Sequence, residues 1–220
     1  MPLAECPRER LAAQGPAALT DAELVALVVG AGVKGASALD LAHAALARHG
    51  GLSALLSASV PLQPGRTRGM GAARYLRLVA GIEIARRAAR ETLSRGGVLS
   101  SPDAVRDYLR LMLSARQNEV FVCLLLDSQH RLIAAEELFQ GTLAQTSVYP
   151  REVVKSALLH NAAAVIFAHN HPSGVAEPSR ADELLTQSLK AALALIDVRT
   201  LDHFVVAGAQ VVSFAERGLL

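Results

Sequence analysis

Hydrophobic and polar residues follow a helical pattern through the first half of the chain. Thr20 precedes an apolar run and Glu23 stands three residues after it, which is the pattern of a capping box at the start of a helix. Ser37 opens a second apolar segment, which a pair of glycines closes, and a long amphipathic run follows over residues 72–93. We therefore predict that the first half is helical.

The second half alternates between two periodicities. Residues 120–126 and 162–168 are continuous apolar runs of strand length, and helical patterns occupy residues 150–161 and 179–196. The remaining predicted elements are a helix that begins at Pro102, a hairpin turn at residues 127–130, and two short strands in TLDHFVVAG and QVVSFAE. This alternation predicts an α/β domain whose mixed sheet is flanked by helices.

A cluster of turn-forming residues separates the two halves. The segment GGVLSSP at residues 96–102 interrupts both patterns. We therefore predict a small, all-helical domain over residues 1–98 and an α/β domain over residues 99–220, which together give an α+β chain.

Composition and charge narrow the function classes. The chain has 220 residues, of which 51% are hydrophobic and 4% aromatic, and its formal net charge is +2. These values exclude extended disorder, and so few aromatic rings argue against a platform that stacks nucleic-acid bases. The charge is uneven, because eight arginines and two glutamates lie between Arg66 and Arg95. Such a basic run is typical of phosphate contact, and equally of a solvated helix face.

Membrane, secretion and cysteine signals all favour the cytoplasm. No apolar stretch approaches the ~18 residues of a membrane span, and the first ten residues lack the apolar core of a signal peptide. Cys6 and Cys123 form no CxxC pair, so they supply neither a disulfide framework nor a zinc site. We predict a cytoplasmic protein with no membrane partner.

The stretch AHNHPSGVAEPSRAD at residues 168–182 carries the candidate chemistry. His169 and His171 are two residues apart at the end of a predicted strand, so both imidazoles can point the same way. Pro172 turns the chain, and Asp182 falls in the first turn of the next helix, where its carboxylate can lean back toward the loop. Two imidazoles and one carboxylate, with a fourth position for water, match the ligand count of a catalytic zinc site.

Each of these residues also has a purely structural explanation. A histidine pair on an apolar segment often occurs without a metal, and Ser179 with Asp182 fits a helix capping box. A helix N-terminus repels a cation, so the Asp182 carboxylate must outweigh the helix dipole. The joint spacing, H-x-H-P followed by S-x-x-D across a bend between strand and helix, favours the metal site.

The joint pattern resembles a known motif. His169, His171, Ser179 and Asp182 in HNHPSGVAEPSRAD resemble the JAMM (JAB/MPN) metalloprotease motif, and most of the chain resembles the bacterial RadC family. The segments that carry the second resemblance are PRERL, EVFVCLLLD, LFQGT, YPREVVKSALLHNAAAVIFAHNHPSG, LDHFVV and SFAERGLL. The resemblance implies a JAMM domain of the cytidine-deaminase-like fold, with a curved mixed sheet flanked by helices.

The resemblance to JAMM proteins also implies a mechanism. It implies one Zn²⁺ per chain, held by His169, His171 and Asp182 together with a water that attacks an amide carbonyl. Glu119, where the first long strand begins, would move the proton of that water, and Ser179 would donate a hydrogen bond to the oxyanion. Spacing alone does not distinguish Glu119 from the other candidates, which are Glu136, Glu137, Glu177 and Glu183.

RadC-like proteins usually carry a helix-hairpin-helix element in the first domain. Here Gly69 and Gly71 form a Gly-x-Gly turn that would offer backbone N–H groups to a phosphate, with Arg68 and Arg74 adding charge. The preceding VPLQPGRTRG contains two prolines and departs from the pattern of a first hairpin helix. The expected partner is DNA, bound without sequence specificity through residues 66–95.

Two functions follow as hypotheses. The first is a zinc-dependent hydrolase, a metallopeptidase or isopeptidase that cleaves an amide bond in a peptide or protein substrate. The alternative, implied by the family's traditional name of DNA repair protein, is a DNA-associated module whose metal site is structural or acts on nucleic acid. No spare carboxylate cluster is spaced for the second metal of such a nuclease. Among the remaining histidines, His203 either hydrogen-bonds near the site or fills the core.

Overall fold

The structure is a computed structural model that describes residues 6–57, 69–95, 102–140 and 148–220. Contacts divide the chain into two compact units, Met1–Ile84 and Ala85–Leu220. The boundary predicted between residues 98 and 99 lies outside the described residues. Within the described ranges, no helix is both long and apolar enough to cross a membrane.

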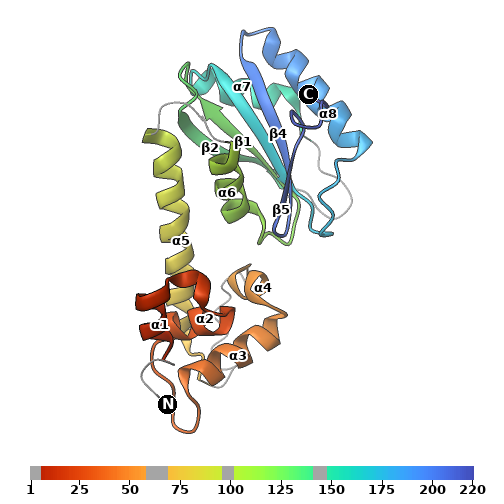
Figure 1. Cartoon of the computed structure of the whole chain (residues 1–220). Coiled ribbons are helices and arrows are strands. Elements are labelled where there is room, and N and C mark those ends of the chain that lie inside the picture. The colour runs from red at the N-terminus through yellow and green to blue at the C-terminus, as the bar shows by residue number, and fades with distance from the viewer. Residues whose placement is uncertain (1–5, 58–68, 96–101, 141–147) are drawn as a thin grey trace. The chain divides into compact units, whose positions relative to one another are not determined.

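The first unit is helical. Its elements are α1 Pro7–Gln14, the 3-10 helix η2 Pro16–Ala18, α2 Asp21–Val29, α3 Ala38–His49, α4 Leu52–Ser57 and the first part of α5 Ala72–Arg95 (Figure 1). The hydrophobic pattern predicts α2, α3 and α5, whose buried apolar residues form one core together with Leu55 of α4. It does not predict α1 and η2, because neither buries a residue and neither therefore carries an apolar stripe.

Two capping boxes begin α2 and α3 in this unit. The Thr20 N–H donates to the Glu23 carboxylate at 2.8 Å, and the Glu23 N–H donates to Thr20 Oγ1 at 3.3 Å. Ser37 and Asp40 repeat the arrangement at 2.8 Å and 3.1 Å. Both start signals predicted from the sequence are therefore confirmed.

The described part of the second unit contains a five-stranded mixed sheet. In chain order its elements are α6 Pro102–Leu113, β1 Val120–Leu126, β2 Leu132–Gln140, α7 Pro150–Leu159, β3 Ala164–Asn170, α8 Arg180–Ala194, β4 Arg199–Ala207 and β5 Gln210–Ser213. The strand order is β2-β1-β3-β4-β5, and only the β3–β4 pair is parallel. This arrangement confirms the prediction of a mixed sheet flanked by helices.

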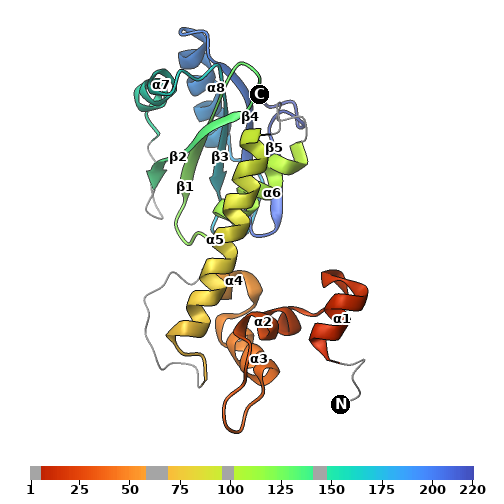
Figure 2. The same ribbon diagram turned by 90° about the vertical axis from the view of Figure 1, so that its left-hand side faces the viewer.

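The central strands of this sheet are buried on both faces. The even-numbered residues of β1 pack into a core shared with α6, and its odd-numbered residues pack into a second core shared with α7 and α8. Figures 1 and 2 show α6 on one face of the sheet, with α7 and α8 on the other. Burial on both faces explains why the strand is a continuous apolar run rather than an alternating one.

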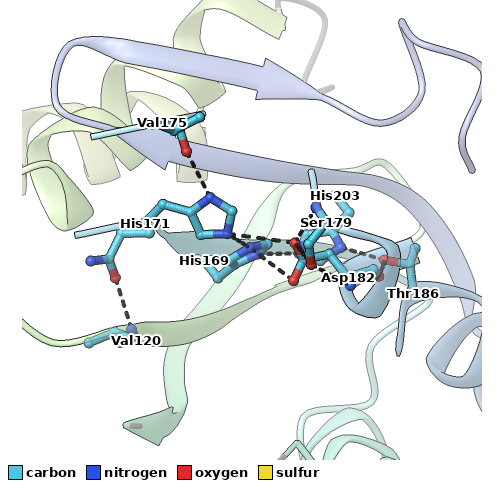
Figure 3. Close-up of polar contacts among 9 residues, drawn as sticks. Val120, His169, His171, Val175, Ser179, Asp182, Thr186 and His203 are labelled. Carbon is cyan, nitrogen blue, oxygen red and sulfur yellow. Dashed lines mark hydrogen bonds and ion pairs between the residues drawn. The ribbon is translucent and has the colours of Figure 1, made fainter. Parts of the chain in front are cut away.

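The connection from β3 through α8 to β4 positions the candidate site. Since β3 and β4 are parallel, α8 must cross over between them along one face of the sheet. The chain therefore turns sharply after β3, and this turn brings the amino end of α8 next to the carboxyl end of β3 (Figure 3). The parallel register places His203 of β4 opposite Phe167 of β3, two residues from His169.

Candidate metal centre

The two histidines of the motif lie at the carboxyl end of β3. His169 is 2% exposed, and His171 follows the last residue of the strand and extends its pairing, since its N–H donates to the Val206 carbonyl at 2.8 Å. Strand alternation places both imidazoles on one side, with their Nε2 atoms 3.0 Å apart (Figure 3). The sequence pattern predicts this convergence.

Asp182 approaches the histidines from the first turn of α8. Its side chain forms a capping box with Ser179, whose N–H and hydroxyl donate to Asp182 Oδ2 at 2.7 Å and 2.6 Å. Its Oδ1 lies 3.4 Å from His169 Nε2, and its Oδ2 lies 3.6 Å from His171 Nε2. The cap thus fixes the carboxylate against both imidazoles, and one ligand atom from each residue lies within 4.8 Å of the others.

The spacing of these three groups fits a small tetrahedral ion. Zinc bonds of about 2.0–2.2 Å in a tetrahedron place neighbouring ligand atoms roughly 3.4 Å apart. The two Nε2 atoms are 3.0 Å apart, and Asp182 approaches His169 through Oδ1 at 3.4 Å and His171 through Oδ2 at 3.6 Å. The residues therefore fit zinc in donor type and number, and each pair of side chains approaches to near the spacing that zinc requires.

Hydrogen bonding directs the lone pair of His171 into the centre. His171 Nδ1 lies 2.8 Å from the carbonyl oxygen of Val175, which can only accept, so Nδ1 carries the proton. In the neutral ring, Nε2 then presents its lone pair to His169 Nε2. Two imidazole nitrogens at 3.0 Å need a proton or a metal ion between them.

The charge of the site favours a cation. Burial alone would raise the pKa of Asp182, but the neighbouring imidazoles of His169 and His171, together with the hydrogen bonds from Ser179, hold that pKa far below its usual range. The same contact with Asp182 raises the pKa of His171, and the charge of Glu119 adds to this rise. The ionised carboxylate therefore offsets the partial positive charge at the amino end of α8.

Glu119 lies directly before β1 and is half-buried. Because β1 and β3 are antiparallel and Phe121 pairs with His169, Glu119 lies at the end of the sheet that carries His171, and its charge contributes to the raised pKa of that histidine. Each of the four competing glutamates is bonded to a side chain other than the proposed ligands. These pairs are Glu136 with Ser156, Glu137 with Arg116, Glu177 with Arg217 and Glu183 with Arg180.

Asn170 is a site residue that the sequence analysis misses. It is 2% exposed and lies between the two histidines, so strand alternation turns it to the opposite side. Its Oδ1 accepts the Val120 N–H at 2.8 Å, and its Nδ2 donates to the carbonyls of Asn118 at 3.0 Å and Arg116 at 3.3 Å. One amide thus holds the backbone on both sides of Glu119. A polar residue at an otherwise apolar strand position is the available sequence signal.

His203 contacts the site and is also part of the core. It is 0% exposed, and its Nε2 lies 2.8 Å from His169 Nδ1. Its Nδ1 lies 2.6 Å from Thr186 Oγ1 on α8. Both uses that the sequence leaves open for His203 are therefore realised together.

The residues predicted to contact nucleic acid have structural partners in the first unit. Gly69 has φ of +84°, which favours glycine, and a Cβ there would also lie 2.4 Å from Leu41 Cδ2, so local backbone conformation and packing already account for the glycine. Arg74 donates to the carbonyls of Gly69 at 2.6 Å, Ala31 at 2.9 Å and Gly32 at 3.1 Å.

The other two residues predicted to contact nucleic acid are Gly71 and Arg68. Gly71 is exposed immediately before α5, whereas Arg68 lies outside the described residues. The segment that would complete a helix-hairpin-helix, residues 58–68, lies outside them too. That motif is therefore not confirmed, and the contact with DNA stays a prediction.

Comparison with known proteins supplies the family. A model described as RadC-like JAB domain matches residues 99–219, and one described as UPF0758 N-terminal matches residues 1–76. A UPF0758 protein of Methylibium petroleiphilum is 63% identical over 214 residues, which are 97% of this chain and 96% of the relative. The UPF0758 protein of Leptothrix cholodnii is 62% identical over 220 residues, 100% of this chain and 99% of the relative. The chain belongs to the UPF0758 (RadC) family.

The family assignment gives the second unit a general chemistry. RadC-like JAB domains belong to a family that includes metal-dependent JAMM hydrolases and usually binds zinc. The three proposed ligands all lie within the segment that the JAB domain model matches. The RadC resemblance predicted from the sequence is thereby confirmed.

Proposed function

We propose that this UPF0758 protein is a zinc-dependent hydrolase that cleaves an amide bond in a peptide or protein. The observation that carries the proposal is the convergence of His169, His171 and Asp182, since one ligand atom from each lies within 4.8 Å of the others. Two imidazoles and one carboxylate leave a fourth position open, which is the arrangement of catalytic rather than structural zinc sites.

Each residue has a distinct part in the proposed reaction. His169, His171 and Asp182 would hold Zn²⁺, which when bound lowers the pKa of water and polarises a carbonyl. Glu119 would accept a proton from the attacking water and deliver it to the leaving amine.

Ser179 would donate its hydroxyl proton to the oxyanion that forms on the substrate. In the structure this hydroxyl donates to Asp182 Oδ2 at 2.6 Å. A serine has one hydroxyl proton, so the proposed role requires the Ser179 hydroxyl to rotate when substrate is present.

Cleavage of nucleic acid is the less favoured alternative. Nucleases of the two-metal type hold a second ion about 3.5–4 Å from the first, with further carboxylates. Across the described ranges, His169, His171 and Asp182 form the one cluster of metal-ligating side chains. This observation favours single-metal chemistry on an amide.

The proposal is tested by measuring zinc content and hydrolysis on the same protein. The probes are fluorescein-labelled casein, a mixture of quenched fluorescent peptides, and supercoiled plasmid DNA. We expect zinc-dependent cleavage of amide probes. Glu119→Gln should keep the zinc and lose about 10²- to 10⁴-fold in rate, because it removes the proton carrier. Glu177→Gln is the matched control, since Glu177 is bonded to Arg217, and it should retain wild-type activity.

Two results would contradict the proposal. Full activity in Glu119→Gln would remove this residue from the reaction. Cleavage of plasmid DNA by the zinc-loaded protein, with the peptide and casein probes left intact, would assign the site to phosphodiesters.

A further inference from the structure

A chain of three hydrogen bonds runs behind the proposed metal ligands. It links His169 Nδ1 to His203 Nε2 at 2.8 Å, His203 Nδ1 to Thr186 Oγ1 at 2.6 Å, and Thr186 Oγ1 to the Asp182 carbonyl oxygen at 2.6 Å (Figure 3). His203 and Thr186 are 0% exposed and His169 is 2% exposed. The protons in these three hydrogen bonds are therefore shielded from solvent, and their positions follow from the donors and acceptors of the protein alone.

The direction of the chain follows from its last member. A carbonyl oxygen can only accept, so the Thr186 hydroxyl donates its one proton to Asp182. The Thr186 oxygen must then accept from His203, which places a proton on His203 Nδ1.

The surroundings of His203 keep its ring neutral. Phe121, Phe167 and Phe214 pack around the imidazole with ring centroids 5.5, 5.9 and 4.7 Å away. The imidazole is 0% exposed among these apolar rings and bonds to His169 and Thr186 rather than to a carboxylate, so an uncompensated positive charge on it would be costly. A neutral ring with its proton on Nδ1 has an accepting Nε2, so the proton between the two histidines belongs to His169 Nδ1.

We propose that Thr186 and His203 are positioning residues that fix His169 in the tautomer whose Nε2 lone pair faces the metal position. The inference rests on the proposed zinc function and adds two residues to it. Asp182 takes part at both ends of this arrangement: its carboxylate is a proposed ligand beside His169, and its backbone carbonyl is the last acceptor in the chain of hydrogen bonds. Partners that orient a metal-binding histidine typically change metal affinity by about 10- to 100-fold.

The test measures zinc affinity of the full chain by competition with a chromophoric chelator. Thr186→Val keeps the shape of the side chain but removes the oxygen that accepts the proton of His203. His203→Phe fills the same aromatic pocket but removes both ring nitrogens, so His169 and Thr186 each lose a hydrogen-bond partner. We expect each to weaken zinc binding about 10- to 100-fold. Thr186→Ser restores the hydroxyl and should bind within about twofold of the wild type.

Val198→Ala is the matched control for loss of packing. Val198 is buried in the core shared by α7 and α8 and belongs neither to the chain of hydrogen bonds nor to the candidate metal site. It should lower the free energy of unfolding while leaving the zinc affinity of the folded protein unchanged. An equal loss of affinity in Val198→Ala and Thr186→Val would show a purely structural role and overturn the inference.

A second measurement reads the tautomer directly in the metal-free protein. Ring ¹⁵N chemical shifts, assigned with the variants above, should show His169 protonated at Nδ1 and unprotonated at Nε2, where it accepts the proton of His171 Nε2 in the absence of metal. A proton on His169 Nε2 would overturn the inference while leaving the hydrolase proposal in place. A wild-type protein that binds no zinc would overturn both. Zinc binding without hydrolysis of any probe would contradict only the proposed function.

Discussion

The two units of this protein each contain the same helix start, and among the residues that the structure describes only the one in the second unit is part of a candidate metal centre. Ser37 with Asp40 and Ser179 with Asp182 are both S-x-x-D capping boxes. Their serine N–H to carboxylate distances are 2.8 Å and 2.7 Å, and their hydroxyl to carboxylate distances are 2.7 Å and 2.6 Å. The local sequence therefore dictates the cap, and nothing in the cap itself distinguishes the two.

The difference lies in what surrounds each carboxylate. Asp40 is exposed, whereas the Asp182 side chain is 13% exposed and meets two imidazoles from β3. Among the described residues of the first unit, Glu23 is the one buried polar or charged side chain. The second unit buries six, and four of these form or support the site: His169, Asn170, Thr186 and His203. Buried polar groups with specific partners mark the functional unit more clearly than any short motif does.

The largest expected effect separates the two carboxylates by metal content. Asp182→Ala removes one of three proposed ligands and should abolish stoichiometric zinc, and His169→Ala should do the same. Asp40→Ala, which breaks the corresponding box in the first unit, should retain one zinc per chain. Elemental analysis after dialysis measures the zinc content. Retention of zinc by Asp182→Ala would contradict the assignment of Asp182, and not Asp40, as a zinc ligand.

The next effect concerns the buried amide beside the second box. Asn170→Ala removes the three hydrogen bonds that hold residues 116–120 and should let Glu119 shift. We expect zinc content to be kept and hydrolysis of the casein probe to fall about 10- to 100-fold, because small misplacements of reacting groups are costly. Asn118→Ala, which removes an exposed amide one residue before Glu119, is the control and should behave as the wild type.

Stability should respond equally at the two boxes. Ser37→Ala and Ser179→Ala each remove a cap whose loss typically costs about 1 kcal/mol. Urea unfolding of the metal-free protein measures the change in unfolding free energy for each variant, Ser37→Ala in the first unit and Ser179→Ala in the second. A much larger loss for Ser179→Ala would show that Ser179 holds the second unit together by more than its cap.

The smallest effect is the acid sensitivity of the first box. Hydrogen bonds from the Ser37 side chain and backbone lower the pKa of Asp40. A lowered folded-state pKa adds stability above the unfolded value of about 4, and this stability is lost as the pH falls through the folded value. The difference in unfolding free energy between wild type and Asp40→Asn should therefore shrink from pH 6 toward pH 3. A difference that stays constant over this range would contradict the assignment.

Periodicity and local spacing predict much of this molecule. They place α2, α3, the helices from α5 onward and the strands, because each buries an apolar stripe or run. They also place His169, His171 and Asp182 together, because strand alternation and a helix cap are local rules.

Long-range contacts escape this reasoning. Asn170 bonds to residues about fifty positions earlier, and His203 meets His169 only through parallel pairing of β3 and β4. Arg74 is similar, since two of its hydrogen bonds go to carbonyls more than forty residues earlier in the chain. Each of these partners is set by the fold and not by neighbouring residues.

The crossover from β3 through α8 to β4 gives the centre an order of assembly. Hairpins such as β1–β2 close early, whereas parallel pairing across a helix is slow because a long loop must be ordered first. A nascent chain that ends at residue 198 already contains His169, His171 and Asp182 but lacks β4 and His203. If His203 orients His169 as proposed, tight zinc binding would require β4, and a chain truncated at residue 198 should bind zinc more weakly than the full chain.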